Sequence, residues 1–467
     1  MVEKFTEFQA KRMEIFREVV KREWNGKLLT NDDLEELVAE IKKKYDYNDE
    51  DDLFIRDHIR VAMGLNPSQS KSFTYELEDI KNLDHIEKPI VTKIEGRCES
   101  CGKELEERDC YNSCKYEAHM YKRSKGPIIV NEKCLNCGSC VSSCSFGAIA
   151  DKIEFLPITN LLKDEETTVY AAVAPSIVGQ FGDDITMGQI RTALKYMGFQ
   201  DMIEVALFAD MLTIKEAFEF DHLVKKEDDF FLTSCCCPVW IRLVENNYPE
   251  VFEHMSPSVS PMVLSGRMLK KLYPDSKVVF IGPCIAKKSE AKEPELAGAI
   301  DFVLTYSELD EIFKALDINL AELPSDEKDQ ASFAGRVYAR TGGVSFSVKT
   351  VVNRIAPRRL VKLRAKKVDG VKECKQILED LLAAKEREAN FVEGMGCDGG
   401  CVGGPRTNID TDKATKIVNE YGEDSLIMTP FDNMNIIKIL QELGSDRIED
   451  LMDEGNEVGR LLIREKQ

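Results

Sequence analysis

The sequence predicts an α/β protein whose parallel sheet lies in the C-terminal two-thirds of the chain. From about residue 168, short apolar runs alternate with helical stretches, an order typical of parallel βαβ units. Residues 98–155 are instead rich in Cys and turn residues, and residues 1–63 show only helical periodicity. At 467 residues the chain has room for about three domains, and we expect them at 1–97, 98–155 and 156–467.

Composition and charge narrow the class of protein. A chain with 43% hydrophobic and 31% charged residues is globular. The formal net charge of −20 disfavours nucleic acid and anionic membrane surfaces as partners. No apolar run approaches the roughly 18 residues of a membrane helix, and the charged start lacks the apolar core of a signal peptide. We therefore expect a cytoplasmic protein with neither nucleic acid nor membrane as a partner.

The N-terminal region is predicted to be helical. Leu34, Leu37, Val38 and Ile41 recur at the spacing of one helix face. A third helix should end near Gly64, before the polar linker NPSQSKS. Nothing here carries chemistry, so we expect a structural or docking appendage.

In the C-terminal part, strands are expected over 169–174, 202–208, 230–234 and 277–282, with helices over 188–199 and 213–220. Cys235 and Cys284 come just after the last two of these four expected strands. Open α/β sheets bind ligands at this edge.

The 15 cysteines are the most informative feature of the composition. Eight lie between Cys98 and Cys144, six form three groups farther on, and Cys374 stands alone and is expected to be a small core residue. In an intracellular chain, clustered cysteines indicate metal or redox chemistry rather than disulfides.

The spacing C-x2-C-x2-C-x3-C is that of a bacterial ferredoxin run, in which the fourth Cys reaches a neighbouring cluster. It is formed by Cys134, Cys137, Cys140 and Cys144, with Ser145 in place of the usual Pro. Thiolates suit iron because they are soft and anionic. The pattern predicts a 4Fe-4S cluster.

An upstream quartet has the same frame with six extra residues between its second and third cysteines: Cys98, Cys101, Cys110 and Cys114. Alone it could be a four-cysteine zinc site, but beside a ferredoxin run a second 4Fe-4S cluster is favoured. The exchange of fourth ligands then gives one cluster to Cys98, Cys101, Cys110 and Cys144, and the other to Cys114, Cys134, Cys137 and Cys140. Residues 98–155 are thus expected to be a ferredoxin-like domain.

A local basic cluster lies within this segment of an otherwise acidic chain: Lys115, His119, Lys122, Arg123 and Lys125. It is either a solvated face or a docking surface for an acidic electron carrier.

Three further cysteine motifs read FLTSCCCPVW (231–240), FIGPCIAKKSEA (280–291) and FVEGMGCDGGCVGGP (391–405). Four or more thiolates from three loops could converge on one site, and the two glycines between Cys397 and Cys401 would let the backbone approach a cofactor. The residues alone indicate a third iron–sulfur site and leave zinc or reactive thiols open.

The three motifs resemble, in order and separation, the signature motifs of the FeFe-hydrogenase (iron-only hydrogenase) family. The second has Pro283, Cys284, Lys287 and Glu290, and the third has Glu393, Met395, Cys397 and Cys401. The resemblance runs from about residue 98 to at least residue 405. The extra Cys in TSCCCP, and Gly282 where a Met often stands, resemble the group B subclass.

The resemblance implies an H-cluster: a 4Fe-4S cubane joined to a two-iron unit that carries CO, cyanide and azadithiolate. It implies Cys284, Cys397 and Cys401 as cubane ligands, with Cys401 the bridge. Lys287 would donate to one cyanide, Ala174, Pro175 and Ser176 would cradle the other, and Met395 would pack near the two irons. For Lys287 and Ser176, a surface lysine and a helix cap are the alternatives.

The triple cysteine leaves the register of the first motif open. Alignment on Thr233 and Ser234 makes Cys236 the fourth ligand and Cys235 the proton donor. Alignment on Pro238 makes Cys237 the ligand and Cys236 the donor. We prefer the second, because Pro238 is expected to start the next helix and fix what precedes it.

The family's proton relay has counterparts here. Glu216 and Glu219 share one helical face, and Ser256 matches the intervening serine. Carboxylates and a hydroxyl in series suit proton hopping, whereas two exposed helix glutamates are the alternative.

The function implied is the reversible oxidation of H2 to protons, with electrons passing through two 4Fe-4S clusters to or from a ferredoxin-type carrier. Dedicated maturases would install the two-iron unit. The alternatives are a non-enzymatic iron–sulfur assembly factor of the same fold and a low-turnover H2 sensor.

Overall fold

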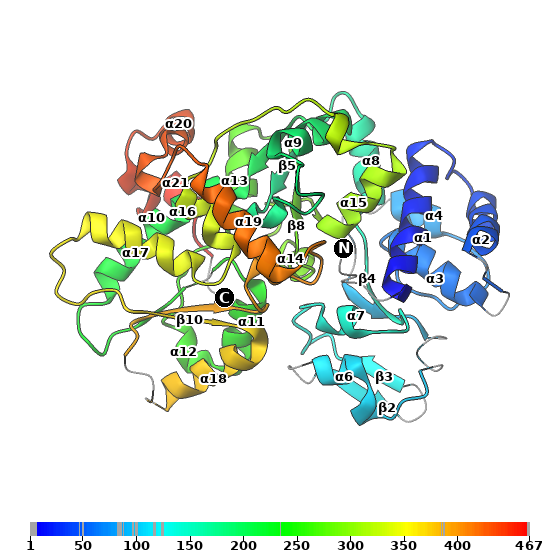
Figure 1. The fold of residues 1–467 in the computed structure, drawn as a ribbon, viewed down its shortest axis with the longest axis horizontal. Helices are drawn as coiled ribbons and strands as arrows, with labels where there is room; N and C mark the ends of the chain where they lie inside the picture. Colours follow the sequence, from blue (N-terminus) through cyan, green and yellow to red (C-terminus); the bar gives the residue numbers. More distant parts are fainter. Residues whose placement is uncertain are drawn as a thin grey trace.

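The computed structural model describes residues 7–45, 47–48, 51–81, 86, 88–95, 98, 101–114, 118–122, 126–233, 235–383, 385 and 388–464. Figure 1 shows three parts of the chain side by side: N-terminal helices, a small segment below them, and a larger α/β part that contains both parallel sheets. Within these ranges, no helix combines the length and the apolar character that a membrane span requires.

The larger sheet has four parallel strands in the order β6-β5-β8-β9. They are β5 (Val169–Val173), β6 (Asp201–Glu204), β8 (Lys277–Gly282) and β9 (Phe302–Thr305). The predicted strands at 169–174 and 277–282 are confirmed. Nearly every residue of β5, β8 and β9 is buried, as expected for strands covered on both faces.

The predicted strand over 202–208 is wrong in its second half. β6 ends at Glu204, and Val205 begins the 19-residue helix α10 (Val205–Leu223). The first three turns of α10 are buried on all sides. An apolar run of this kind does not distinguish a buried strand from a buried helix, because neither leaves a polar face.

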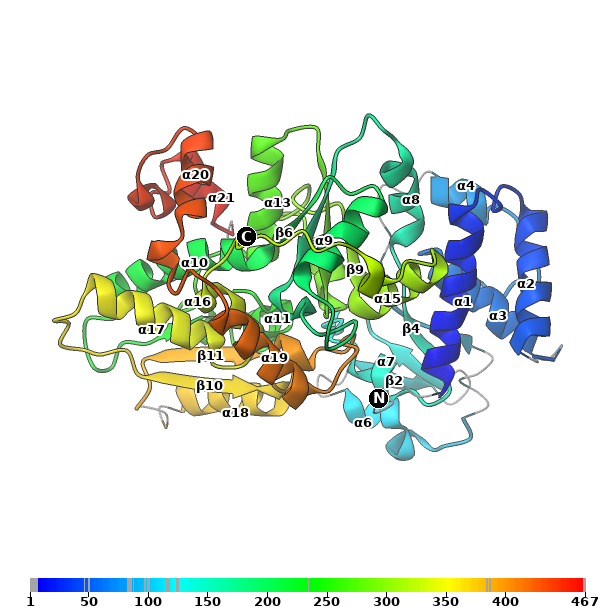
Figure 2. The same cartoon turned by 45° about the horizontal axis from the view of Figure 1, so that its top comes forward.

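A second parallel sheet has the order β10-β11-β7. Its strands are β7 (Phe231–Leu232), β10 (Ala365–Asp369) and β11 (Phe391–Met395), so the strand predicted over 230–234 is shorter than expected. Figure 2 shows α17 (Gly343–Ile355) on one side of this sheet and α18 (Gly370–Leu382) on the other. The three cysteine motifs follow directly after β7, β8 and β11, which brings them to neighbouring strand ends.

The remaining helices of the α/β part cover these sheets. They are α8 (Phe155–Lys163), α9 (Met187–Tyr196), α11 (Pro238–Asn247), α12 (Pro249–Phe252), α13 (Pro261–Leu272), α14 (Ala286–Glu290), α15 (Tyr306–Ala315), α16 (Phe333–Arg336), α19 (Thr411–Glu423), α20 (Met434–Glu442) and α21 (Glu457–Leu461). The helices predicted over 188–199 and 213–220 correspond to α9 and to part of α10.

The N-terminal region is helical, as predicted. Its helices are α1 (Glu7–Trp24), α2 (Asn31–Tyr45), α3 (Asp52–Ala62) and α4 (Glu76–Lys81). α1 packs against α15 and α8, and Phe16, Val19 and Phe155 belong to one apolar core. The helices are therefore continuous with the core of the α/β part, and the division into three domains at 97 and 155 stays a prediction.

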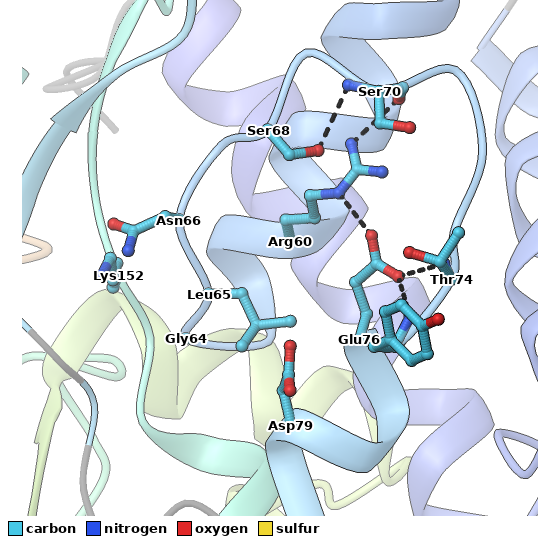
Figure 3. Close-up of a pocket in the computed structure, with 11 residues that line it drawn as sticks. Arg60, Gly64, Leu65, Asn66, Ser68, Ser70, Thr74, Glu76, Asp79 and Lys152 are labelled. Carbon is cyan, nitrogen blue, oxygen red and sulfur yellow. Dashed lines mark hydrogen bonds and ion pairs between the residues drawn. The ribbon is translucent and has the colours of Figure 1, made fainter.

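One buried arginine orders the polar linker between α3 and α4. Arg60, 1% exposed, donates to Asp57 and Glu76 and to the carbonyls of Ser70 and Ser72. Figure 3 shows this arginine at the edge of a pocket of about 590 Å³ that Lys152 also lines. Because the guanidinium satisfies the linker carbonyls, a segment that reads as a loose connection is fixed against α3.

The cysteine-rich segment is built from two antiparallel strand pairs and two short helices. β1 (Val91–Lys93) pairs antiparallel with β4 (Ile149–Asp151), and β2 (His119–Lys122) with β3 (Gly126–Ile129). α6 (Asp109–Ser113) and α7 (Ser139–Ser143) pack on each other. Each helix carries the third cysteine of its quartet and ends just before the fourth. The two quartets, which have similar spacing in the sequence, therefore also have similar local structure.

The predicted basic cluster cannot be placed. Lys115, Arg123 and Lys125 lie outside the described residues, as do the side chains of His119 and Lys122.

A buried charge network joins all three parts of the chain at Asp151 on β4. The Asp151 carboxylate accepts hydrogen bonds from Arg12 of α1 at 3.0 Å, from Lys288 of α14 at 3.2 Å, and from Arg406. Lys288 also donates to Glu308 of α15 at 2.6 Å. Burial alone would raise the pKa of Asp151, but Arg406, Arg12 and Lys288 hold it well below its ordinary value. The carboxylate is therefore ionised and shared by three cations.

Replacing Asp151 with Asn should destabilise the protein by about 3–5 kcal/mol, because it leaves buried cations without their common counter-charge. Since the folded-state pKa is lowered, the carboxylate contributes stability above the unfolded-state value near about 4 and loses it only as pH falls through the folded-state pKa. Thermal unfolding of iron-loaded protein from pH 5 to 8 should show a constant deficit.

The control is Asp310→Asn, because Asp310 forms a half-exposed pair with Lys314 at 2.7 Å and such pairs are worth about 0.3–0.5 kcal/mol. A deficit for Asp151→Asn as small as that of the control would contradict the role assigned to the network.

Candidate active site

Four thiols from three loops surround one region between the two sheets. They are Cys237, at the start of α11, Cys284, two residues after β8, and Cys397 and Cys401, in the loop after β11. Burial and then the charges of Cys237 and Cys401 raise the pKa of Cys284 to about 12. The pKa of Cys397 is raised in the same way, by burial and by the charges of Cys284, Cys237 and Cys401. These charge interactions link each of the four thiols to at least one other, so the four lie near one another.

The donor set fits an iron–sulfur cubane. The four thiols keep some accessible surface. Cys284 and Cys401 line one cavity, and Cys397 lines another. The Cys237 sulfur also accepts a hydrogen bond from the Gly396 backbone N–H at 3.3 Å. Four soft thiolates with a backbone donor are the ligands that clusters take in proteins.

The three consecutive cysteines point to different surroundings. Cys237 belongs to the group of four thiols, whereas Cys236 lines a cavity together with Cys284, Lys287 and Cys401. Cys235 is 2% exposed, and its pKa is raised by burial and by the neighbouring Glu216 carboxylate. Pro238 starts α11 as expected, while Ser234 lies outside the described residues. This placement supports the alignment on Pro238.

The cavity beside Cys401 is lined by residues from both of the predicted cyanide-binding groups. Ala174 and Pro175 line it, on the loop after β5, and Lys287 lines it from α14. Ser176 is fully buried and its hydroxyl is 2.7 Å from that of Tyr306, so it lies behind the lining rather than in it. Met395, at the end of β11, is buried in the apolar cluster that includes Cys236 and Cys237.

Lys287 is not the surface lysine of the alternative reading. It is 6% exposed and donates to Glu290 at 2.5 Å. Burial would lower the pKa of Lys287, but Glu290, Cys284 and Cys236 raise it above the ordinary value. The side chain is therefore a protonated ammonium group that faces the cavity among thiols.

The two predicted relay glutamates both lie on α10, but in different environments. Glu216 is fully buried and accepts from the Thr233 hydroxyl at 2.6 Å. Its other oxygen has no hydrogen-bond partner within the described part of the chain. Glu219 is partly exposed and accepts from the Ser256 hydroxyl at 3.2 Å. Glu216 is therefore not an exposed helix glutamate, as the alternative interpretation required.

A buried lysine holds the outer glutamate in place. Lys215 is 2% exposed, forms an ion pair with Glu219, and donates to the Ser258 hydroxyl at 3.2 Å. One Glu219 oxygen thus faces Lys215 while the other accepts from Ser256.

The two glycines between Cys397 and Cys401 allow a close contact with another segment of the chain, while their approach to a cofactor stays a prediction. Gly399 and Gly400 have φ of 79° and 86°, a region that favours glycine. A Cβ on Gly400 would lie 2.9 Å from the Thr341 backbone nitrogen. Only glycine lets this loop pass so close to the segment before α17.

Sequence reasoning missed two residues that shape the site. Tyr338 lines the cavity beside Cys236, and its hydroxyl is 2.7 Å from that of Thr213. Arg406 donates from its backbone N–H to the Pro283 carbonyl at 3.1 Å and from its side chain to Asp151. Tyr338 carries no spacing signal, and the only sign of Arg406 is its position directly after the third motif. Cys374 is a small core residue, as predicted, at 1% exposed.

The two upstream quartets are interleaved in space. Burial raises the pKa of Cys110 to about 11, and the nearest charged thiols are Cys144 and Cys98. Burial likewise raises the pKa of Cys134 to about 11, and the charged thiols that act on it are Cys137 and Cys114. The fourth cysteine of each quartet thus lies beside the other quartet. Among the described residues, no three His, Cys, Asp or Glu side chains are already arranged closely enough to hold a metal ion.

The second group lies closer to the four-thiol site. Cys137 is among the thiols that raise the pKa of Cys397, and both line a cavity of about 640 Å³ between α7 and the loop after β11. The order in space is therefore the Cys98 group, the Cys134 group and the four-thiol site.

Comparisons with known proteins agree with this geometry. The family model of the iron only hydrogenase large subunit, C-terminal domain, matches residues 167–405, more than half of the chain, and a 4Fe-4S binding domain matches residues 127–150. FeFe-hydrogenase HydA1 from Chlamydomonas reinhardtii has the same fold, with a TM-score of 0.53 at 23% identity over 66% of this chain and 96% of that chain.

Similar curated proteins include hydrogenases and an assembly factor. Iron hydrogenase 1 of Clostridium pasteurianum is 30% identical over 61% of this chain and 65% of its own length. The NADP-reducing hydrogenase subunit HndD of Solidesulfovibrio fructosivorans is 27% identical over 58% and 55%. Both matches span less than two thirds of the relative. The cytosolic Fe-S cluster assembly factor NAR1 of Yarrowia lipolytica is 23% identical over 42% and 46%.

Glu216→Gln should change how stability depends on pH. Burial raises the pKa of Glu216 to about 7, with the Thr233 hydrogen bond opposing the shift. Because a raised carboxyl pKa favours the protonated folded state, the wild type loses stability as pH rises from the unfolded-state value near about 4.3 through 7. The amide has no charge to bury, so its stability relative to wild type should rise by about 2–3 kcal/mol between pH 5 and 8.

Thermal unfolding at several pH values measures this difference, and Glu245→Gln on the exposed face of α11 reports the effect of losing a surface carboxylate. A constant difference between Glu216→Gln and wild type across the range would refute the raised pKa.

Proposed function

Because this chain belongs to the iron-only hydrogenase family, we propose that it catalyses the reversible oxidation of H2 to two protons and two electrons. The observation that carries the proposal is the convergence of four thiols beside a cavity lined by Cys236 and a buried, protonated Lys287. A structural site needs neither a thiol nor a buried lysine in the lining of a cavity beside the four thiols. The TSCCCP motif supports placement in the group B subclass.

The residues present fit the family's cofactor. Cys237, Cys284, Cys397 and Cys401 would hold a 4Fe-4S cubane, and Cys401 would bridge to a two-iron unit in the cavity that it lines. When bound, the two-iron unit supplies the metal site at which H2 is split or formed. Lys287 would bind a cyanide as a compact cation. Ala174 and Pro175 line the same cavity, and Ser176 lies behind them. Met395 packs from β11.

The proposed proton route leaves the cavity through α10. Cys236 would exchange the proton with the cofactor, and Glu216, Ser256 and Glu219 would pass it to the surface. A pKa near 7 lets Glu216 take up and release a proton near neutral pH. The Thr233 hydroxyl holds Glu216 in place.

The proposed electron route leaves on the other side. The cluster held by Cys114, Cys134, Cys137 and Cys140 would exchange electrons with the active-site cubane, because Cys137 and Cys397 line one cavity. The cluster held by Cys98, Cys101, Cys110 and Cys144 would be the outer one. We propose a ferredoxin-type carrier as the external partner, maturases for the two-iron unit, and a cytoplasmic location.

A second candidate is an iron–sulfur assembly factor without hydrogenase activity. The similarity to NAR1 favours it. The buried Lys287 and the Glu216 route are features that proton chemistry requires and cluster transfer does not. Infrared bands of CO and cyanide in matured protein would separate the two functions, since an assembly factor needs no two-iron unit.

Matured protein should evolve H2 from a reduced low-potential donor, and Cys236→Ser should lower turnover at least about 100-fold while keeping the cubane and the infrared bands. A serine hydroxyl is far less acidic than a thiol, and a positioned general acid is worth about 10²–10⁴-fold. Cys237→Ala should lose cubane iron. H2 production, iron content and infrared spectra measure these effects.

Cys235→Ser is the matched control for register and should retain most of the turnover. If Cys235→Ser were slow with its cluster intact, and Cys237→Ala kept its cubane, the alignment on Thr233 would be correct. Fully metallated protein without H2 evolution or H/D exchange would reject the hydrogenase function.

Protein that lacks the two-iron unit should contain about 12 iron atoms, from three clusters of four. A content near about eight, with one zinc, would assign the Cys98 quartet to a zinc site. Metal analysis of anaerobically reconstituted protein distinguishes the two.

A further inference from the structure

The six extra residues of the upstream quartet bring a buried arginine to a cysteine sulfur. Between Cys101 and Cys110, a short 3-10 turn (Leu105–Glu107) leads into Arg108, directly before α6. Arg108 is 7% exposed, an unusual position for a charged side chain on a short surface insert. The insert is therefore folded around this side chain rather than extended into solvent.

The contacts of Arg108 fix its direction. Its Nε donates to the Lys103 carbonyl at 2.9 Å, which closes the insert on itself. Its Nη1 lies 3.4 Å from the Cys98 carbonyl oxygen and 3.6 Å from the Cys98 sulfur, both as hydrogen bonds. A planar guanidinium can make these contacts at once because its donors are held in a rigid fork.

The surroundings of the Cys98 sulfur are cationic. Burial raises the pKa of the Cys98 thiol, and the charges of Lys93 and Arg108 oppose that shift. The two cations thus stabilise negative charge on this sulfur. Lys93 reaches it from β1 and also pairs with Glu95 at 2.8 Å, whereas Arg108 alone donates a hydrogen bond to the sulfur among the contacts of the described residues.

The other quartet has a different environment. The Cys137 sulfur lies 3.4 Å from the Ser139 hydroxyl, and the Cys134 sulfur 3.8 Å from the Asn136 amide oxygen. These side chains are neutral. The charge of Arg242 also acts on Cys134, but Arg242 is paired with Glu293 at 2.7 Å and donates no hydrogen bond to the sulfur among the contacts of the described residues. The short C-x2-C-x2-C spacing leaves no insert that could fold a charged side chain back onto its own ligands. The insert therefore makes the two sites electrostatically unequal.

We propose that Arg108 is a tuning residue that raises the reduction potential of the outer 4Fe-4S cluster above that of the neighbouring cluster. A cluster that takes up one electron becomes more negative, and a cation that donates a hydrogen bond to a ligand sulfur stabilises the reduced form. The outer cluster then holds the electron that arrives from the external carrier. The inference rests on the proposed function only in requiring that Cys98 binds a cluster.

The test is a redox titration of protein that carries three 4Fe-4S clusters and lacks the two-iron unit. Each cluster takes one electron from a reductant through soluble mediators, and EPR records its reduction. Cys110→Ala, which removes an outer-cluster ligand, identifies the outer wave as the one that disappears. Arg108→Gln should shift that wave to lower potential and leave the other two unmoved. Arg108→Lys keeps the charge but not the fork, and should shift it less.

The matched control is Lys103→Met in the same insert. Lys103 forms an exposed pair with Asp109 at 2.9 Å, and its charge acts on Cys101 without donating a hydrogen bond to a cysteine sulfur among the contacts of the described residues. The outer wave should therefore move much less than in Arg108→Gln, and the other two waves should not move. Three clusters with an unshifted outer wave in Arg108→Gln would overturn the inference alone. An equal shift of all three waves would also overturn it, because the effect would not be local. Wild-type protein without the outer wave would reject the cluster at Cys98, and the inference with it.

Discussion

The arrangement of the molecule depends on one buried carboxylate. Asp151 lies on the last strand of the cysteine-rich segment, and its three cationic partners come from α1, from α14 beside Lys287, and from the residue that follows the third cysteine motif. An ionised group without water requires all of them, because an unpaired charge in the interior is far more costly than a lost packing contact. The N-terminal helices, the outer cysteines and two of the motif loops are thereby held in one arrangement.

What the sequence could predict was local. Spacing identified the cysteine quartets, the glycines that allow the third loop, and the strands that end before two motifs, because these depend on residues close together in the chain. The sequence predicts a strand over residues 205–208, because a helix buried on all sides lacks the polar face by which a helix is recognised. Arg12, Asp151 and Arg406 meet across more than 250 positions, and Tyr338 and Arg108 act through placement alone, so neither their partners nor their directions could be read from spacing.

The two charges of the proposed reaction leave by separate paths. The carboxylates lie on α10, while the cysteine quartets lie around α6 and α7, and Figure 2 shows α10 well apart from these two short helices. The carboxylate side relies on a group whose pKa burial brings near neutrality. The cysteine side relies on buried thiols and an arginine that compensates their charge. Keeping them apart prevents the cations that favour electron storage from lowering the proton affinity of Glu216.

The interleaving of the two quartets has a consequence for how the segment assembles. On the proposed ligand sets, neither quartet can complete a cluster from its own stretch of chain, since α6 and α7 must meet before either fourth cysteine is in place. Metal loading is then coupled to the packing of α6 on α7. Loss of Cys114 or Cys144 would therefore remove a ligand from the cluster that the other stretch of chain mainly holds.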